Sequence, residues 1–178
     1  MSTIQVKDKH FKPFISAEQI NTAICRIAAE INRDLADKNP LFLCVLNGAF
    51  MFASDLYKEI TIDSEITFMR MKSYEGMSTT GHVKSISGLH EDVTGRTIVV
   101  IEDIVDTGYT MKSIISQLEE KGAGEIRIAT LLYKPEALKV DLKLDYVALE
   151  IPNAFIVGYG LDYDELGRNL KDIYVIAD

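Results

Sequence analysis

The sequence predicts a single α/β domain in which a mainly parallel, twisted sheet is flanked by helices. The chain has 178 residues, the ordinary length of one domain. Strand and helix patterns alternate through its middle, which is typical of parallel strands joined by crossover helices. Residues 41–46 form an unbroken apolar run, which indicates a strand buried on both faces. We therefore expect one domain over residues 1–178.

The first half of the chain predicts two helices and three strands. Ser16 and Gln19 have the spacing of a capping box, and apolar residues then recur at helical spacing as far as Leu35. Asn39-Pro40 ends this pattern. The expected elements are a helix over 17–37, a strand over 41–46, a helix over 49–58, and strands over 65–72 and 83–87.

The second half predicts further alternation, with a site at one edge of the sheet. Residues 73–81 and 103–108 break the periodicity and are expected to be loops, the first of them mobile. The expected elements are strands over 97–102, 126–133 and 146–151, a helix over 110–121, and short strands at 156–158 and 173–176. Ligands bind at the carboxyl ends of parallel strands, so the site should gather the loops after residues 46, 102, 133 and 151.

Composition limits the classes of partner. The net charge of −8 disfavours nucleic acid and anionic membranes, unless a local basic patch is present. A phosphorylated substrate must then be held by backbone amides, a few cations or a bound metal. No apolar run approaches the roughly 18 residues that span a bilayer, and residues 1–7 lack the apolar core of a signal peptide. The expected compartment is the cytoplasm.

The cysteines and histidines carry no signal for chemistry. Cys25 lies in a helical pattern and Cys44 in a strand pattern, and we expect both to be buried free thiols. No CxxC spacing is present. His10, His82 and His90 have neither ligand spacing nor the order of a Ser-His-Asp arrangement, and we expect them to be solvated at loops or edges.

The segment 99–110 is the strongest candidate site. It runs from an apolar strand through an acidic corner into a helix start, where unpaired N–H groups favour an anion. Gly108 allows close approach of a phosphate. The patterns of the Walker and dinucleotide-binding loops are absent. Three carboxylates could accept ribose hydroxyls, support Mg²⁺ or take a proton. From composition alone, a solvated acidic turn before an ordinary helix is an equal alternative.

The run Val-Val-Ile-Glu-Asp-Ile-Val-Asp-Thr-Gly-Tyr-Thr over 99–110 resembles the phosphoribosyl diphosphate signature of type I phosphoribosyltransferases, in its hypoxanthine-guanine form. The resemblance extends in matching order from about residue 41 to 176. It implies the type I fold, with a small hood from about 1–15 and 150–178. It also implies Mg²⁺-dependent transfer of the 5-phosphoribosyl group to N9 of hypoxanthine, and of guanine, giving IMP or GMP and pyrophosphate. Relatives are usually dimers or tetramers.

The resemblance implies a role for each residue of the signature. Glu102 and Asp103 would hold the ribose hydroxyls and Mg²⁺, and Asp106 would be the general base or acid at N7 of the purine. The 5′-phosphate would be bound by Asp106, Thr107, Gly108, Tyr109 and Thr110. Many relatives carry Lys where this chain has Tyr109, but a backbone N–H serves equally in either case.

Two further segments match the parts of the family that bind and enclose the diphosphate. The pyrophosphate would be bound by Leu46, Asn47, Gly48 and Arg168. In several relatives the first of these segments contains an unusual cis peptide, and Lys or Arg is common where this chain has Asn47. Ser73 and Tyr74 would begin a lid that excludes water from the reacting centre. Without the resemblance, these are a plain turn and a polar loop.

The purine would be bound by a strand end and a C-terminal segment. Lys134 would donate to O6 and so select 6-oxopurines. Phe155 would stack on the base, the backbone of Ile156 would pair with its edge, and Asp162 would hold a second Mg²⁺ through water. Ala154 is often Lys in relatives. Without the resemblance, the lysine is a surface residue and the phenylalanine a core aromatic.

Two alternative functions remain open from the sequence. One is a phosphoribosyltransferase for adenine, orotate or xanthine. Lys134 and the segment around Phe155 argue against adenine and orotate. The other is a regulator that senses phosphoribosyl diphosphate while binding nucleic acid. The net charge of −8 argues against it.

Overall fold

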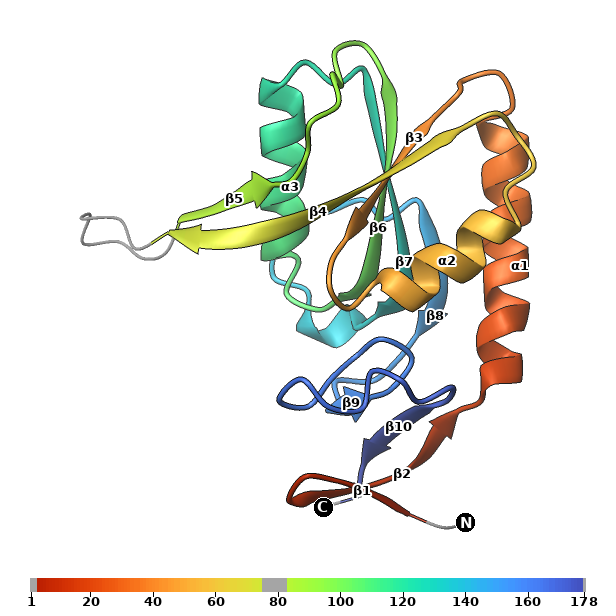
Figure 1. The fold of residues 1–178 in the computed structure, drawn as a ribbon, viewed down its shortest axis with the longest axis vertical. Coiled ribbons are helices and arrows are strands. Elements are labelled where there is room, and N and C mark those ends of the chain that lie inside the picture. Colours follow the sequence, from red (N-terminus) through yellow and green to blue (C-terminus); the bar gives the residue numbers. More distant parts are fainter. Residues whose placement is uncertain (1–2, 75–82, 178) are drawn as a thin grey trace.

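The protein consists of a large sheet with helices on both faces and a smaller sheet beneath it (Figure 1). The computed structural model describes the backbone of residues 3–74 and 83–177, and side chains except those of 72–74 and 83–84. Both ends of the described chain lie at the smaller sheet. We call this smaller sheet the hood sheet.

The large sheet has six strands in the order β5-β4-β3-β6-β7-β8. All neighbouring pairs are parallel except β4 and β5, which are antiparallel. This arrangement confirms the predicted fold class. The strands are β3 Leu41–Val45, β4 Glu65–Tyr74, β5 Val83–Ser87, β6 Thr97–Val105, β7 Glu125–Tyr133 and β8 Tyr146–Glu150.

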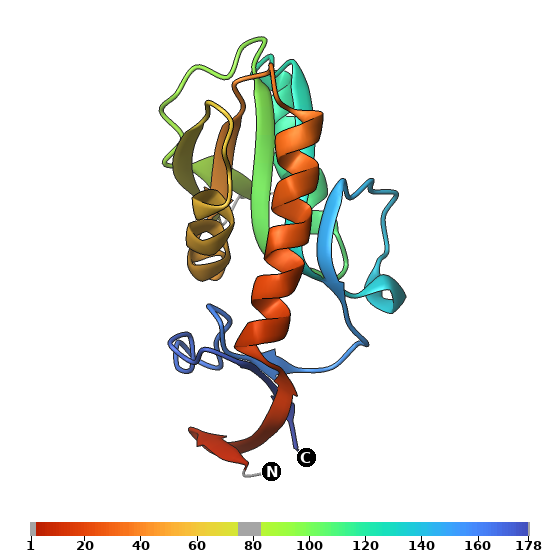
Figure 2. The ribbon, with the colours of Figure 1, turned by 90° about the vertical axis from the view of Figure 1, so that its right-hand side faces the viewer.

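The two faces of the large sheet are covered by different helices, as Figure 2 shows from the side. Phe42 and Cys44 of β3 belong to the core under α1 and α2, whereas Leu41 and Leu43 belong to the core that includes Ile114 of α3. All five residues of β3 are buried, which explains its unbroken apolar run. The helices are α1 Ala17–Asp34, α2 Phe50–Lys58, α3 Tyr109–Glu120 and the short 3-10 helix η1 Pro135–Ala137.

The capping box before α1 is present, because the Ser16 hydroxyl accepts from Gln19 N while the Gln19 side chain accepts from Ser16 N. The expected end of this helix was wrong. Leu35 has φ −116° and ψ 20°, which is outside the helical region, so α1 ends at Asp34 rather than at residue 37. The apolar spacing continued because Leu35 is itself fully buried.

Two predicted loops are partly strand. β6 continues to Val105, since Ile104 pairs with Leu132 and Val105 with Tyr133, so residues 103–105 are not loop. β4 continues through residues 73 and 74, which pair with β5. In both places a neighbouring strand supplies the hydrogen bonds that outweigh local polarity. The remainder of the expected loop at 75–81 lies outside the described residues.

The hood sheet joins the two ends of the chain. Its strands are β1 Ile4–Val6, β2 Lys9–Ile15, β9 Ile156–Val157 and β10 Ile173–Ile176, antiparallel in the order β1-β2-β10-β9. Phe11 and Val157 are fully buried beneath it. The sequence did not predict β1 or β2, which are completed by pairing with a strand from the opposite end of the chain.

Several single-residue expectations are also tested. Cys44 is buried, but Cys25 is exposed on α1, so the expectation of a buried thiol there was wrong. It follows the buried Ile24 on the outer side of the helix. His10 and His90 are exposed as predicted, and His82 lies outside the described residues. Within the described chain, every helix is too short or too polar to cross a bilayer.

Candidate functional site

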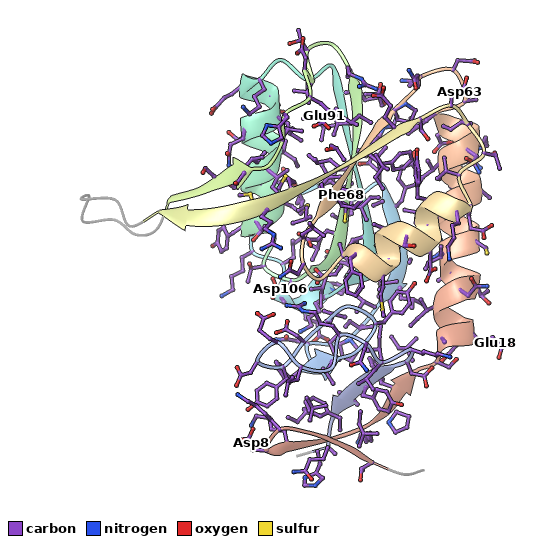
Figure 3. The ribbon with its side chains drawn as sticks, viewed as in Figure 1. Asp8, Glu18, Asp63, Phe68, Glu91 and Asp106 are labelled. Atoms are coloured by element: carbon purple, nitrogen blue, oxygen red, sulfur yellow. The ribbon has the colours of Figure 1, made fainter. Side chains whose placement is uncertain are left out.

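The candidate site lies where the carboxyl ends of the parallel strands face the hood sheet. Figure 3 places Asp106 just beyond β6, between the large sheet and the hood. The strand ends are held together there, because Lys134 N donates to Val105 O at 3.0 Å and Ile151 N donates to Tyr133 O at 2.8 Å. The loops expected to gather at this edge therefore do so for β6, β7 and β8.

A hollow of about 240 Å³ occupies the acidic corner. Its lining includes Glu102, Asp103 and Asp106, together with Gly108 and Thr110 at the start of α3. Asp106 is exposed, and its Oδ1 accepts from the N–H of Thr107 at 2.5 Å. The corner thus presents carboxylates on one side and a helix start on the other.

The start of α3 is open to an anion. Gly108 is its N-cap with φ 85°, and no described side chain accepts from the first N–H groups of this helix. A Cβ at Gly108 would lie 2.7 Å from Val140 Cγ2 and 2.9 Å from Leu138 Cδ1, so both conformation and space require glycine. Tyr109 is 58% exposed and leaves the backbone of this turn accessible.

Glu102 and Asp103 form a buried acid pair. Glu102 is 7% exposed, and its Oε1 accepts from the N–H of Asp103 at 3.1 Å. Burial, and next the charge of Asp103, raise the pKa of Glu102 well above its ordinary value. Burial also raises the pKa of Asp103, against the opposing effects of its hydrogen bonds and of Arg168. Two crowded carboxyl groups of this kind suit a divalent cation or donating hydroxyls.

The turn after β3, residues 46–48, lies directly against Asp103 of this pair. The Leu46–Asn47 peptide is cis, at the segment where the resemblance implied one. A Cβ at Gly48 would lie only 1.7 Å from Asp103 Oδ2, so the loop backbone and the carboxylate are in close contact. Asn47 is exposed. The structure therefore brings residues 46–48 and Asp103 together.

Arg168 reaches the same place from the hood. Its Nη1 donates to Gly160 O at 2.7 Å, and its Nη2 lies 3.0 Å from Asp162 Oδ1. Gly160 lies against the backbone of Gly48, so this guanidinium is close to the segment that touches Asp103. Asp162 is occupied by this ion pair. Among the described residues, no three His, Cys, Asp or Glu side chains gather into a ready-made metal cluster.

Phe155, next to β9 in the hood sheet, presents an exposed aromatic ring. It is 45% exposed, so it is not the core aromatic that composition alone favoured. Tyr163 packs edge-on against its ring with centroids 5.8 Å apart, and Phe11 of β2 lies 6.1 Å away. Its neighbour Ile156 is buried and pairs with Val175 in the hood sheet. The ring is thus supported from behind and open in front.

Some predicted site residues are not described and some useful ones were missed. The side chains of Ser73 and Tyr74 lie outside the described part, although their backbone completes β4. Sequence reasoning missed Tyr159, whose hydroxyl donates to Asp55 of α2. These two residues are 104 positions apart, and no local pattern signals the contact. It also missed Tyr163 as the support of Phe155.

Comparison with known proteins agrees with this geometry. The family model described as "Phosphoribosyl transferase domain" matches residues 16–164. The hypoxanthine-guanine phosphoribosyltransferase of Bacillus subtilis (strain 168) is 44% identical over 167 residues, 93% of this chain and 92% of that protein. That of Streptococcus thermophilus (strain CNRZ 1066) is 40% identical over 168 residues, 94% and 93% of the two chains.

Solved structures agree as well. A hypoxanthine phosphoribosyltransferase from Staphylococcus aureus superposes with a TM-score of 0.85 at 36% identity, covering 93% of this chain and 90% of that one. A hypoxanthine-guanine phosphoribosyltransferase from Bacillus anthracis gives a TM-score of 0.83 at 35% identity, covering 94% and 97%. The chain therefore belongs to the type I phosphoribosyltransferases, in their hypoxanthine-guanine phosphoribosyltransferase branch.

Proposed function

We propose that this protein is a purine-salvage enzyme that transfers the 5-phosphoribosyl group of phosphoribosyl diphosphate to N9 of hypoxanthine or guanine. The products are IMP or GMP and pyrophosphate. One observation carries the proposal. The acidic corner and the open start of α3 line one hollow, and Gly48 lies directly against Asp103 at its edge.

The 5′-phosphate binds at the start of α3. The backbone amides of Gly108, Tyr109 and Thr110 point their dipoles at an anion, and the hydroxyls of Thr107 and Thr110 add donors. Asp106 closes the near end of this turn through its bond from Thr107 N. Tyr109 takes part through its backbone, so the exchange of Lys for Tyr at this position leaves the binding mode unchanged.

Glu102 and Asp103 accept hydrogen bonds from the ribose hydroxyls and are the residues suited to hold Mg²⁺. When bound, Mg²⁺ offsets the diphosphate charge and helps pyrophosphate to leave. The donor set fits, because buried carboxylate oxygens are hard ligands whose mutual repulsion a cation relieves. Asp162 is the candidate for a second ion through water, once its bond with Arg168 opens.

Asp106 handles the proton of the purine. The bond from C1 of the ribose to the pyrophosphate oxygen breaks, the bond from N9 to C1 forms, and the proton at N7 passes to the Asp106 carboxylate. The exposed position of Asp106 at the mouth of the corner lets it reach the base. The amides of residues 46–48 and the Arg168 guanidinium stabilise the departing pyrophosphate.

The base is selected by charge and shape. Phe155 stacks on the purine with its exposed face, and the backbone of Ile156 pairs with the base edge. Lys134 donates a hydrogen bond to O6 of the purine. The 6-amino group of adenine is itself a donor and could not accept this bond. Ser73 and Tyr74 begin the lid that keeps water from the electron-poor C1 centre. Much of the acceleration then comes from alignment in the closed site.

The protein works as a cytoplasmic homodimer or homotetramer. Two large aromatic side chains support self-association, since Phe50 at the start of α2 is 41% exposed and Phe68 on β4 is 46% exposed. Figure 3 labels Phe68 on β4 of the large sheet. Light scattering coupled to gel filtration measures the mass, and a monomer at micromolar concentration contradicts this part of the proposal.

The activity is tested by incubating the protein with hypoxanthine, phosphoribosyl diphosphate and Mg²⁺ and quantifying IMP and pyrophosphate. The expected result is equal amounts of both products, with none after chelation of the metal. Asp106→Asn should retain substrate affinity and lower kcat by about 100-fold or more. Absence of IMP contradicts the proposed reaction, and wild-type turnover by the variant contradicts the role of Asp106.

A further inference from the structure

Tyr159 connects the chain between β9 and β10 to α2 through a partly buried side-chain hydrogen bond. Its side chain is 6% exposed, and its hydroxyl donates to Oδ2 of Asp55 on α2 at 2.5 Å. The other oxygen of Asp55 lies 2.7 Å from Lys58 Nζ. Figures 1 and 2 both show the chain between β9 and β10 directly beneath α2. The bond thus crosses the boundary between the two sheets.

The chemistry of this bond is that of a phenol donating to a carboxylate. Burial raises the pKa of Tyr159, so its hydroxyl keeps its proton. Burial acts to raise the pKa of Asp55 too, but hydrogen bonds from Lys58 and Tyr159 outweigh this, and the pKa is lowered. A charge-assisted bond of this type is stronger than one between neutral groups.

The turn that contains Tyr159 touches the pyrophosphate loop through its next residue. Tyr159 has φ 50° and lies in the turn 158–161, which is closed by hydrogen bonds between Gly158 and Leu161 in both directions. A Cβ at Gly160 would lie 2.2 Å from Gly48 O, so the two glycine backbones are in direct contact. Movement of the turn therefore moves the surface against which residues 46–48 rest.

The same turn also holds Arg168. Gly160 O accepts from Arg168 Nη1 at 2.7 Å, and Gly160 N donates to Arg168 O at 2.9 Å. The neighbouring Tyr159 N donates to Leu170 O at 2.8 Å. The turn 158–161 thus contacts both elements assigned to pyrophosphate, which are residues 46–48 and the Arg168 guanidinium. Among the described residues, the bond from Tyr159 to Asp55 is the only side-chain hydrogen bond between this turn and α2.

We infer that Tyr159 is a positioning residue for pyrophosphate recognition, because its bond to Asp55 fixes the turn that locates both Gly48 and Arg168. The inference rests on the proposed function of this site. It predicts that binding of the diphosphate is weakened while binding of the purine base is not. Loss of the bond weakens the diphosphate subsite, whereas the base subsite at Phe155 is supported separately by Phe11 and Tyr163.

A second tyrosine in the chain provides a matched control. Tyr146 of β8 is 2% exposed, and its hydroxyl donates to Asp34 Oδ2 of α1 at 3.1 Å. Asp34 is likewise paired with a cation, since Arg33 Nε lies 2.9 Å from its Oδ1. Tyr146→Phe therefore removes the same kind of bond between a strand and a helix. Among the described residues, no side-chain hydrogen bond or ion pair joins Tyr146 or Asp34 to a residue assigned to the site.

The experiment compares Tyr159→Phe with Tyr146→Phe by calorimetric titration with magnesium pyrophosphate, alongside steady-state kinetics and Tm. We expect both variants to lose similar thermal stability. Tyr159→Phe should weaken pyrophosphate binding and raise the KM for phosphoribosyl diphosphate, each by about tenfold. Its KM for hypoxanthine should stay within about twofold of wild type. Tyr146→Phe should change none of these three quantities.

Equal pyrophosphate affinity in the two tyrosine variants overturns the inference, and so does an equal rise in both KM values of Tyr159→Phe. Asp55→Asn supplies a second variant if the first does not fold. It keeps an acceptor oxygen but removes its charge, and it should weaken pyrophosphate binding in the same direction, whereas unchanged binding overturns the inference. If the wild type forms no IMP, the proposed function fails, and the titrations still decide the role of Tyr159.

Discussion

The contact between Gly48 and Asp103 allows a sharp test of how the turn at residues 46–48 and the acid pair depend on each other. In Gly48→Ala the new Cβ would lie 1.7 Å from Asp103 Oδ2 and 2.8 Å from its Cγ. Since carbon atoms do not approach such oxygens within 3.0 Å, one partner must move by about 1.3 Å. Misplacement by about 1 Å in a reacting site costs about 100-fold in rate.

We therefore expect Gly48→Ala to lower kcat/KM for phosphoribosyl diphosphate by about 100-fold, or about 2.7 kcal/mol in transition-state stabilisation. The assay is the initial rate of IMP formation at saturating hypoxanthine. Stability should fall by about 1–3 kcal/mol, as for other overpacked sites. Gly95→Ala controls for the loss of stability, because Gly95 has φ 70° but no atom within 4 Å of a new Cβ.

A double variant isolates the contact itself. In an Asp103→Ala background the clashing oxygens are gone, and the remaining Asp103 Cβ is at an ordinary 3.6 Å. Adding Gly48→Ala to that background should change kcat/KM by less than about twofold. The reasoning is refuted if Gly48→Ala alone keeps wild-type kcat/KM. It is also refuted if Gly48→Ala still lowers kcat/KM by about 100-fold when Asp103 is already alanine.

Three further predictions follow from burial and charge. Glu102→Gln should raise the Tm of the substrate-free protein at about pH 8. Burial and the Asp103 charge raise the pKa of Glu102. The wild type therefore loses stability as the pH rises above the ordinary Glu pKa of 4.5, and the uncharged glutamine avoids this loss. The difference in Tm should close near pH 4.5, and a pH-independent difference contradicts it. Burial, with the nearby carboxyl groups, raises the pKa of Cys44 to about 12, whereas Cys25 is exposed. A thiol reagent at about pH 8 should therefore modify only Cys25 in the folded chain and both thiols after denaturation. Lys134→Ala should reduce the preference for hypoxanthine over adenine by about 10–100-fold in kcat/KM, since O6 loses a charged donor, and an unchanged ratio argues against that contact.

The large sheet could be predicted because its signals are local. The unbroken apolar run of β3 reflects burial on both faces, and the alternation of strands and helices indicates parallel pairing. The ends of elements were less predictable. Residues 103–105 look like loop because the acidic pair Glu102-Asp103 interrupts the apolar run, yet pairing with β7 holds them in strand. β1 and β2 were missed because their partner, β10, lies at the other end of the chain.

The candidate site also has parts that a local sequence signal predicts and parts that depend on contacts between distant segments. The segment 99–110 carries its own signal, since an acidic corner and a helix start are contiguous in sequence, and the structure places them around one hollow. The contacts that organise the site around it are non-local. Gly48 lies against Asp103, and Tyr159 binds Asp55, only because the sheet and the hood bring distant segments together. No spacing along the chain indicates either contact.

The most direct test of the proposed activity is a parallel measurement of kcat/KM for hypoxanthine, guanine, adenine and orotate with phosphoribosyl diphosphate and Mg²⁺. Nucleotide formation from hypoxanthine and guanine, with values for adenine and orotate lower by about 100-fold or more, is the expected result. Efficient use of adenine or orotate, or no nucleotide from any of these bases, would contradict a 6-oxopurine phosphoribosyltransferase built on the acidic corner of residues 99–110.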